Sequence, residues 1–196
     1  MKKRTAMIAL GGNSLSPKDI AGSIEEQFRY TRDTVEGLSI FIESSYNVCV
    51  THGNGPQVGD ALHRMDLTSE QIPPLPLGVC VAGTQGQMGY MIQQSLQNKL
   101  REMKIDREVV TMVTQVIVDR NDESLKNPTK YIGPRYSKDE ILKLSENFNW
   151  NIKEQEPGFW RRVVPSPMPE YIMHGKSIKA LVDRGTIVIA FGGGGI

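Results

Sequence analysis

The sequence predicts an α/β fold built around a parallel-type β-sheet. Short apolar runs alternate along the chain with longer segments of helical periodicity, and this alternation is typical of parallel sheets covered by helices. Three of the apolar runs end abruptly in glycines, as buried strands do when they run into tight turns. The 196 residues are 39% hydrophobic and 23% charged, which suits one packed domain, or one and a fraction.

The first half of the chain contains two of these strands and one long helix. The apolar runs at residues 6–10 (AMIAL) and 46–51 (YNVCVT) are both followed by glycine-rich turns. Apolar side chains recur at helical spacing through residues 23–44, which predicts a single helix that buries one face.

Two further helices are predicted over residues 57–65 and 79–103, with a proline-rich loop between them. The second helix contains Gly83, Gly86 and Gly89 at intervals of three residues. Residues at this spacing share roughly one face of a helix, and glycines there would let another backbone approach closely.

The strongly β-branched run at residues 109–118 predicts a third strand. Residues 119–163 are polar and contain scattered aromatic residues but no continuous core pattern. We interpret this segment as an inserted, protruding subdomain, and residues 1–118 and 164–196 as the main, substrate-binding α/β domain.

The last part of the chain returns to the α/β pattern. Residues 161–164 have the texture of a strand, residues 177–184 that of a helix, and residues 186–191 (TIVIAF) form the fourth apolar strand, followed by Gly192 to Gly195.

Composition excludes several classes of function. The formal net charge of +1 gives no reason to expect nucleic acid or a membrane as a partner. The apolar stretch after the basic N-terminus is too short for a signal peptide or a membrane span. Cys49 and Cys80 lie in apolar runs, as buried free thiols do in a reducing cytosol, so a cytoplasmic location is expected. The three histidines lack the spacing of metal ligands.

The glycine turns are the candidate site. They follow the strands at Leu10, Thr51 and Phe191, and the first two also contain Asn13 and Asn54. Such turns let the backbone approach a ligand and direct N–H groups at its oxygens, and ligands gather at the carboxyl ends of parallel strands. Any one of these turns alone is most simply a structural turn. None has the spacing of a P-loop or of a dinucleotide-binding fingerprint.

Seven motifs, in order along the chain, resemble those of carbamate kinases, which are members of the amino-acid kinase family. The most specific are HGNGPQVG at residues 52–59 and RRVVPSP at residues 161–167. The others are ALGGNSL (9–15), TQG with GY (84–90), TQV with Asp119 (114–119), NPTK with IGP (127–134) and GGGGI (192–196).

The resemblance implies a three-layer α/β/α sandwich with an open, mainly parallel sheet. It implies reversible phosphoryl transfer between ATP and carbamate, usually toward ATP in arginine and carbamoyl-phosphate catabolism, with Mg²⁺ and the nucleotide as cofactors. It also implies a homodimer. An inactive half that only binds carbamate or carbamoyl phosphate, or another amino-acid kinase, are the alternatives.

The implied site residues lie mostly in the glycine turns. Substrate contacts would come from Gly11, Gly12, Asn13, Gly53, Asn54 and Gly55. Catalysis would use Gly12 and Asn13 together with Lys130, a cation that closes over the phosphate. Taken alone, Lys130 is a solvated surface lysine. Gly193 and Gly194 would lie on the side of the nucleotide phosphates, and no protein metal site is expected.

The sequence departs from the family pattern at Gly78, at Tyr131 and over residues 155–159. The resemblance also places a nucleotide-binding lobe after the GGGGI run, and that lobe is not in these 196 residues. We interpret Arg161 and Arg162 as surface ion pairs of a strand and His52 as a residue that stabilises its turn.

Overall fold

The computed structural model describes residues 3–11, 15 and 23–193. The chain divides into two compact units. The first unit comprises the described parts of Met1–Asn54, Gln85–Thr114 and Met173–Gly193, and the second comprises Gly55–Thr84 and Gln115–Ile172.

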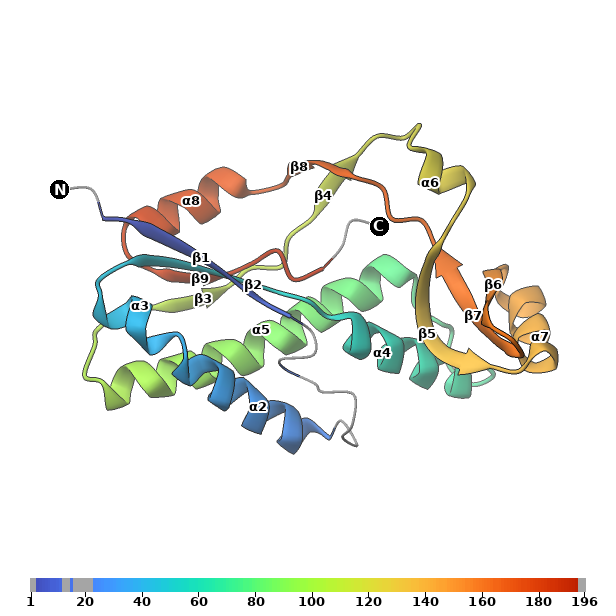
Figure 1. Ribbon diagram of the computed structural model, residues 1–196, viewed down its shortest axis with the longest axis horizontal. Coiled ribbons are helices and arrows are strands. Elements are labelled where there is room, and N and C mark those ends of the chain that lie inside the picture. The colour runs from blue at the N-terminus through green and yellow to red at the C-terminus, as the bar shows by residue number, and fades with distance from the viewer. Residues whose placement is uncertain (1–2, 12–14, 16–22, 194–196) are drawn as a thin grey trace. The chain divides into compact units, whose positions relative to one another are not determined.

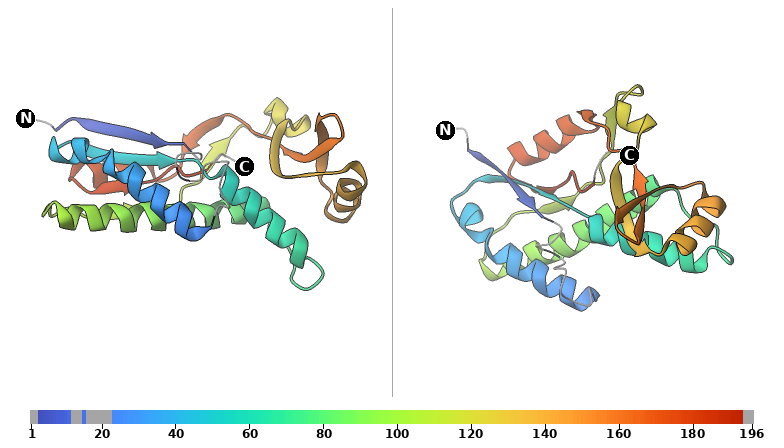
Figure 2. Two further views of the ribbon diagram at one scale, coloured as in Figure 1. Left: turned by 60° about the horizontal axis from the view of Figure 1, so that its bottom comes forward. Right: turned by 45° about the vertical axis from the view of Figure 1, so that its right-hand side comes forward.

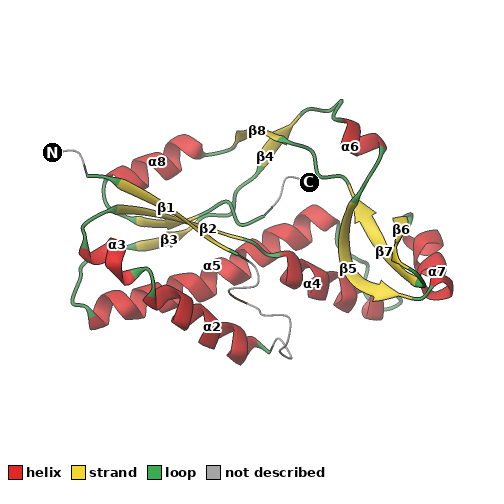
Figure 3. Ribbon diagram, viewed as in Figure 1, coloured by secondary structure: helices red, strands yellow, loops and turns green. Residues whose placement is uncertain are grey.

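The first unit is built on a four-stranded parallel sheet in the order β1-β2-β9-β3 (Figure 1). The strands are β1 (Thr5–Leu10), β2 (Asn47–His52), β9 (Ile187–Ile189) and β3 (Val109–Thr111). The predicted parallel α/β fold is therefore confirmed, and the secondary structure is coloured in Figure 3.

Helices cover both faces of this sheet, as the three-layer expectation requires. Alternate residues of β2 and β9 belong to two separate cores, because side chains in a strand alternate between faces. Val48, Val50 and Ile189 pack with α2 (Ile24–Glu36), α3 (Ser39–Glu43) and α5 (Leu77–Glu102). Cys49 and Val188 pack with α8 (Gly175–Asp183). In Figure 2 the blue α2 and the green α5 run along the same side of the strands.

The helix predicted over residues 23–44 is divided into α2 and α3. It begins as the sequence suggests, since Ser23 and Glu26 form a capping box. Next to Gly37 a hydrogen bond spans three residues instead of the four of an α-helix, because the Leu38 N–H donates to the Val35 carbonyl at 2.9 Å. Glycine is a poor helix former, and this point separates the two helices.

The close approach of a backbone predicted for the three glycines of α5 is not found, although a side chain packs closely against one of them. A Cβ atom on Gly89 would lie 2.1 Å from Cγ2 of Thr111 on β3, whereas Cβ atoms on Gly83 and Gly86 would meet nothing within 4 Å. The side chain of Thr111, not a backbone segment, makes the close approach at Gly89, and its hydroxyl donates to the Gly89 carbonyl at 3.0 Å.

The single strand predicted over residues 109–118 is wrong. The structure has β3 (Val109–Thr111) in the parallel sheet and β4 (Val116–Val118) in a different, antiparallel pair with β8 (Pro169–Ile172). Between β3 and β4, the side-chain amide of Gln85 forms hydrogen bonds with both backbone groups of Thr114. The Thr114 N–H donates to Oε1 at 2.9 Å, and the Thr114 carbonyl accepts from Nε2 at 3.1 Å. A backbone bonded to a side chain in this way leaves the strand ladder.

The second unit contains α4 (Gly55–Thr68) and a three-stranded antiparallel sheet in the order β5-β7-β6. The strands are β5 (Lys130–Tyr136), β7 (Phe159–Val164) and β6 (Asn151–Glu156). The short α6 (Glu123–Lys126) precedes β5. Helix α7 (Lys138–Phe148) starts with a capping box from Ser137 and ends at Asn149 in the left-handed conformation.

Among the described residues, none of the helices combines the length and the apolar character that crossing a membrane requires. Cys49 and Cys80 are both buried free thiols, as predicted.

Candidate functional site

Three of the glycine turns begin at neighbouring strand ends. Strands β1, β2 and β9 are adjacent and parallel, so their carboxyl ends lie at one edge of the sheet. Gly11 follows β1, Gly53 follows β2, and Gly192 and Gly193 follow β9. This is the edge where parallel sheets bind their ligands.

The second turn continues the hydrogen-bonding ladder to the first. The Gly53 N–H donates to the Leu10 carbonyl at 3.0 Å, which holds the two turns side by side. Gly11 is exposed, whereas the Asn54 side chain is buried, with 7% of the residue exposed. Gly55 is the first residue of α4, and the first N–H groups of a helix favour an anion.

His52 packs inside this edge. It is 6% exposed, and its Nδ1 lies 3.1 Å from the Gly53 carbonyl oxygen. Because a carbonyl can only accept, this contact requires the proton on Nδ1. Burial lowers the pKa of His52, partly offset by the hydrogen bond to Gly53. A buried neutral imidazole bonded to its own turn supports the interpretation of His52 as a turn-stabilising residue.

The third turn is shaped by His52. A Cβ atom on Gly192 would lie 2.1 Å from Nε2 of His52, so position 192 tolerates no side chain without movement of the ring. The preceding residue, Phe191, has a φ of 60°, which is unusual for a bulky residue. Its N–H donates to Oγ1 of Thr114 at 3.2 Å.

Thr114 and Gln85 are therefore supports of the third turn, a role that the sequence did not reveal. Gln85 bonds to both backbone groups of Thr114, and Thr114 in turn holds the backbone at Phe191. Both residues stand in motifs quoted above, TQG and TQV, and their place in those motifs was the only available signal.

The edge formed by these turns suits an oxyanion. It combines the glycines with the buried amide of Asn54, and none of the described residues of the three turns carries a carboxylate. Three predicted residues, Gly12, Asn13 and Gly194, lie outside the described residues.

Comparison with known proteins identifies the relatives of this chain. No family model matches the sequence. A carbamate kinase of Pyrococcus furiosus is 46% identical over 198 residues, which span 100% of this chain and 63% of that protein. A carbamate kinase of Staphylococcus epidermidis is 43% identical, over 97% of this chain and 60% of that protein. The chain is a carbamate kinase homologue.

Solved structures agree with this assignment. A carbamate kinase from Giardia lamblia bound to AMP-PNP matches with a TM-score of 0.90 and 35% identity, over 99% of this chain and 62% of that one. A protein from Aeropyrum pernix matches with a TM-score of 0.92 and 34% identity, over 98% of this chain and 62% of that one. The chain thus spans between 60% and 63% of the length of these four proteins, and the similarity is to their amino-terminal portion.

Lys130 of the carbamate kinase homologue lies in the second unit. It is the first residue of β5, is exposed, and pairs with Val164 of β7. The last residue of the NPTK motif therefore lies beside Val164 of the RRVVPSP motif, although the two motifs are separate in sequence.

The interpretation of Arg161 and Arg162 as surface ion pairs is wrong. Both are partly buried, and neither forms an ion pair in the part of the chain that the structure describes. The Arg161 side chain donates to the Gly133 carbonyl, and the Arg162 guanidinium lies 4.7 Å from the centre of the Trp150 ring. Burial lowers the pKa of both groups.

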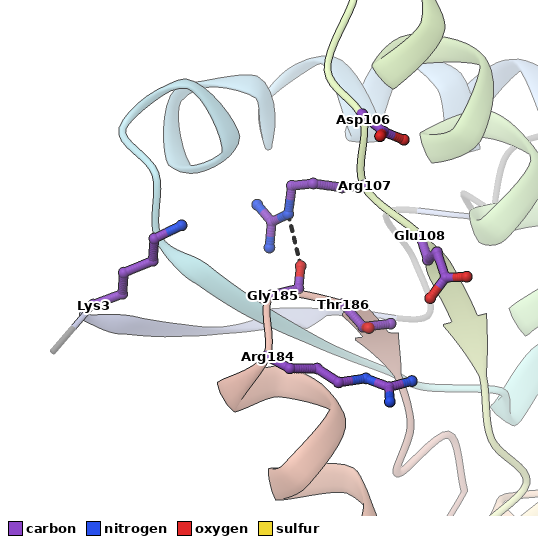
Figure 4. Close-up of a pocket in the computed structure, with 7 residues that line it drawn as sticks. All are labelled: Lys3, Asp106, Arg107, Glu108, Arg184, Gly185 and Thr186. Atoms are coloured by element: carbon purple, nitrogen blue, oxygen red, sulfur yellow. Dashed lines mark hydrogen bonds between the residues drawn. The ribbon is translucent and has the colours of Figure 1, made fainter.

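A cavity of about 650 Å³ opens at the opposite, amino edge of the same sheet (Figure 4). Its central residue is Arg107, which donates to the Gly185 carbonyl at 2.8 Å and to the Tyr46 carbonyl at 3.1 Å. Arg107 thereby joins the chain segments that lead into β2, β3 and β9. None of the predicted site residues lines this cavity, so we assign Arg107 to the fold and not to the site.

Proposed function

We propose that the protein catalyses reversible phosphoryl transfer between carbamoyl phosphate and ADP, which forms carbamate and ATP. The observation that carries this proposal is the edge of β1, β2 and β9, where glycine turns begin at three adjacent, parallel strand ends. The similarity to carbamate kinases over the whole of this chain supports it.

In this proposal the first two turns hold the substrate. Gly11, with Gly12 and Asn13, receives the phosphoryl oxygens, while Gly53, Asn54 and Gly55 receive the carbamate end. An oxygen of the ADP β-phosphate attacks phosphorus, and the bond from phosphorus to the carbamate oxygen breaks with its electron pair on that oxygen. Carbamate leaves as an anion, so no proton transfer is needed and His52 needs no role as a base.

Lys130 supplies positive charge during transfer. Phosphoryl transfer depends on positioning and on neutralising the charge of the transferring group more than on covalent chemistry. In this proposal the ammonium group of Lys130 closes over the substrates and excludes water.

The proposed nucleotide is ATP or ADP, because a homologue from Giardia lamblia has been solved with AMP-PNP. Gly193, with Gly194, would lie beside its phosphates. The turns carry no carboxylate, and the described residues contain no cluster of three metal-binding side chains. We assign Mg²⁺ no step in this proposal. We also propose a homodimer in the cytoplasm, on the resemblance alone.

The first test compares the full gene product with a polypeptide of residues 1–196. We expect ATP formation from ADP and carbamoyl phosphate by the full gene product. We expect none from the polypeptide, because the remaining length of the relatives has no counterpart in it. A coupled ATP assay measures both. Turnover by the polypeptide at about 1 per second or more would show that this segment suffices. Inactivity of both would favour the alternative, a module that only binds substrate.

The second test concerns the second glycine turn. Asn54→Ala should weaken binding of carbamoyl phosphate by about 1–3 kcal/mol, the range for leaving a buried polar partner unsatisfied. Isothermal titration with carbamoyl phosphate measures the loss. The matched control is Asn98→Ala, since Asn98 is exposed on α5 and should leave binding unchanged. Equal binding by Asn54→Ala and the parent protein would make this turn structural only.

A further inference from the structure

Strand β5, which begins at Lys130, is interrupted by a bulge. Ile132 pairs with Arg162 of β7, and the next pair is Tyr136 with Trp160. Between these pairs β5 advances four residues while β7 advances two, so residues 133–135 include two residues without a partner in the ladder. Gly133 has a φ of 71°, and Pro134 has no N–H to donate. The bulge therefore begins directly after the three paired residues, Lys130 to Ile132, at the start of β5.

Arg161 of β7 holds the bulge with its side chain. Its Nη2 donates to the Gly133 carbonyl at 2.7 Å, and its Nη1 donates to Oε1 of Gln155 at 3.3 Å. A buried or half-buried carbonyl needs a donor, and the Gly133 carbonyl lies where the register of β5 against β7 is interrupted. The Arg161 guanidinium supplies a donor to it.

An arginine at position 161 is unfavourable for the stability of the folded state. It is partly buried, its Nε is buried without a hydrogen-bond partner, and it forms no ion pair within the described residues. Burial, and then the neighbouring charge of Arg135, lower its pKa. Burying a charge without a countercharge is unfavourable, and apolar residues in such places are often as stable or more so. An arginine in this position calls for a role that depends on geometry.

A second contact fixes the other side of the bulge to α4. The Tyr136 hydroxyl donates to Oδ2 of Asp66 at 2.7 Å. Closer to the start of the helix, a Cβ atom on Gly59 would lie 3.7 Å from Cα of Gly133. Helix α4 begins at Gly55, one of the proposed substrate residues. Within the second unit, the bulge is therefore tied to the helix that starts at the substrate turn.

We propose that Arg161 is a positioning residue for Lys130: by holding the Gly133 carbonyl it fixes the bulge of β5 and so the direction in which Lys130 is presented. This inference rests on the proposed function, in which Lys130 acts on the transferring phosphoryl group. Arg161 itself contacts neither substrate nor nucleotide in this scheme.

The test is a double-mutant cycle in the full gene product. Arg161→Met should lower kcat by roughly 10- to 100-fold, the scale of a small misplacement of a catalytic group, while KM for ADP changes less than about twofold. In a Lys130→Ala background the same substitution should lower kcat by no more than about twofold, because the group that it positions is gone. Hydrogen exchange of the amides at 131–133 should become faster in Arg161→Met.

The control is Arg135→Met in the same bulge. Arg135 is exposed and pairs with Glu156 at 2.9 Å, so its loss removes a charge without releasing the Gly133 carbonyl, and kcat should hold. Arg161→Lys keeps the charge and one donor and should recover part of the rate. It also serves as the test variant if Arg161→Met does not fold.

Three results would overturn the inference. If the losses of Arg161→Met and Lys130→Ala simply multiply, Arg161 acts independently of Lys130, and the proposed function survives. If Arg161→Met leaves kcat unchanged, the bulge needs no such support. If Lys130→Ala leaves kcat unchanged, the role proposed for Lys130 fails, and this inference fails with it.

Discussion

Lys130→Ala is expected to lower the turnover of the full gene product by about 100-fold or more. The loss follows from removing a positive charge that is close to the transferring phosphoryl group in the proposed mechanism, where fixed charges act in a site closed to water. Stability should change little, because Lys130 is exposed at the first position of β5 and has no core to lose. Steady-state kinetics and thermal melting, measured on the same preparation, separate the two effects.

The matched control for this experiment is Lys126→Ala. Lys126 is an exposed lysine at the end of α6, four residues before Lys130. Its removal changes the net charge by the same amount and should leave kcat unchanged. If both variants turn over at the parent rate, Lys130 is an ordinary surface lysine, as most lysines are. The placement of catalytic charge on the second unit is then wrong.

The sheet and its glycine turns could be predicted because their signals are local. The run TIVIAF followed by glycine reports both burial and the strand end within a few residues. The run AMIAL marks its strand end correctly, but the burial predicted for it is wrong, because β1 is an edge strand in which Met7 is 69% exposed. Since parallel strands align their carboxyl ends, the meeting of the turns of β1, β2 and β9 at one edge followed from the fold class.

Contacts made by distant side chains could not be predicted. The run at 109–118 is strongly β-branched, yet Gln85, 29 residues before Thr114, forms hydrogen bonds with both backbone groups of Thr114 and so interrupts the strand. Likewise, nothing local in the run RRVVPSP shows that Arg161 reaches a carbonyl 28 residues away. The sequence predicts surface ion pairs for Arg161 and Arg162 because charged residues are usually at the surface.

Gly192→Ala is expected to destabilise the protein by about 2–3 kcal/mol, at the upper end of the range for overpacking a core. The new methyl group would lie 2.1 Å from Nε2 and 2.2 Å from Cε1 of His52. The ring has little freedom to move, since it is buried and bonded to the Gly53 carbonyl through Nδ1. Chemical denaturation measures the change in the free energy of unfolding.

Two further variants decide whether the His52 contact is the cause. Gly86→Ala, on the same unit, places its Cβ in open space within helix α5, so it should be neutral or slightly stabilising, as alanine favours helices over glycine. In a His52→Ala background the space beside position 192 is free, and Gly192→Ala should then be far less harmful, which gives a coupling energy of about 1 kcal/mol or more. If Gly192→Ala destabilises both backgrounds equally, the close approach of the second and third turns is not what requires glycine at position 192. The packing of His52 against the third turn would then not define this edge.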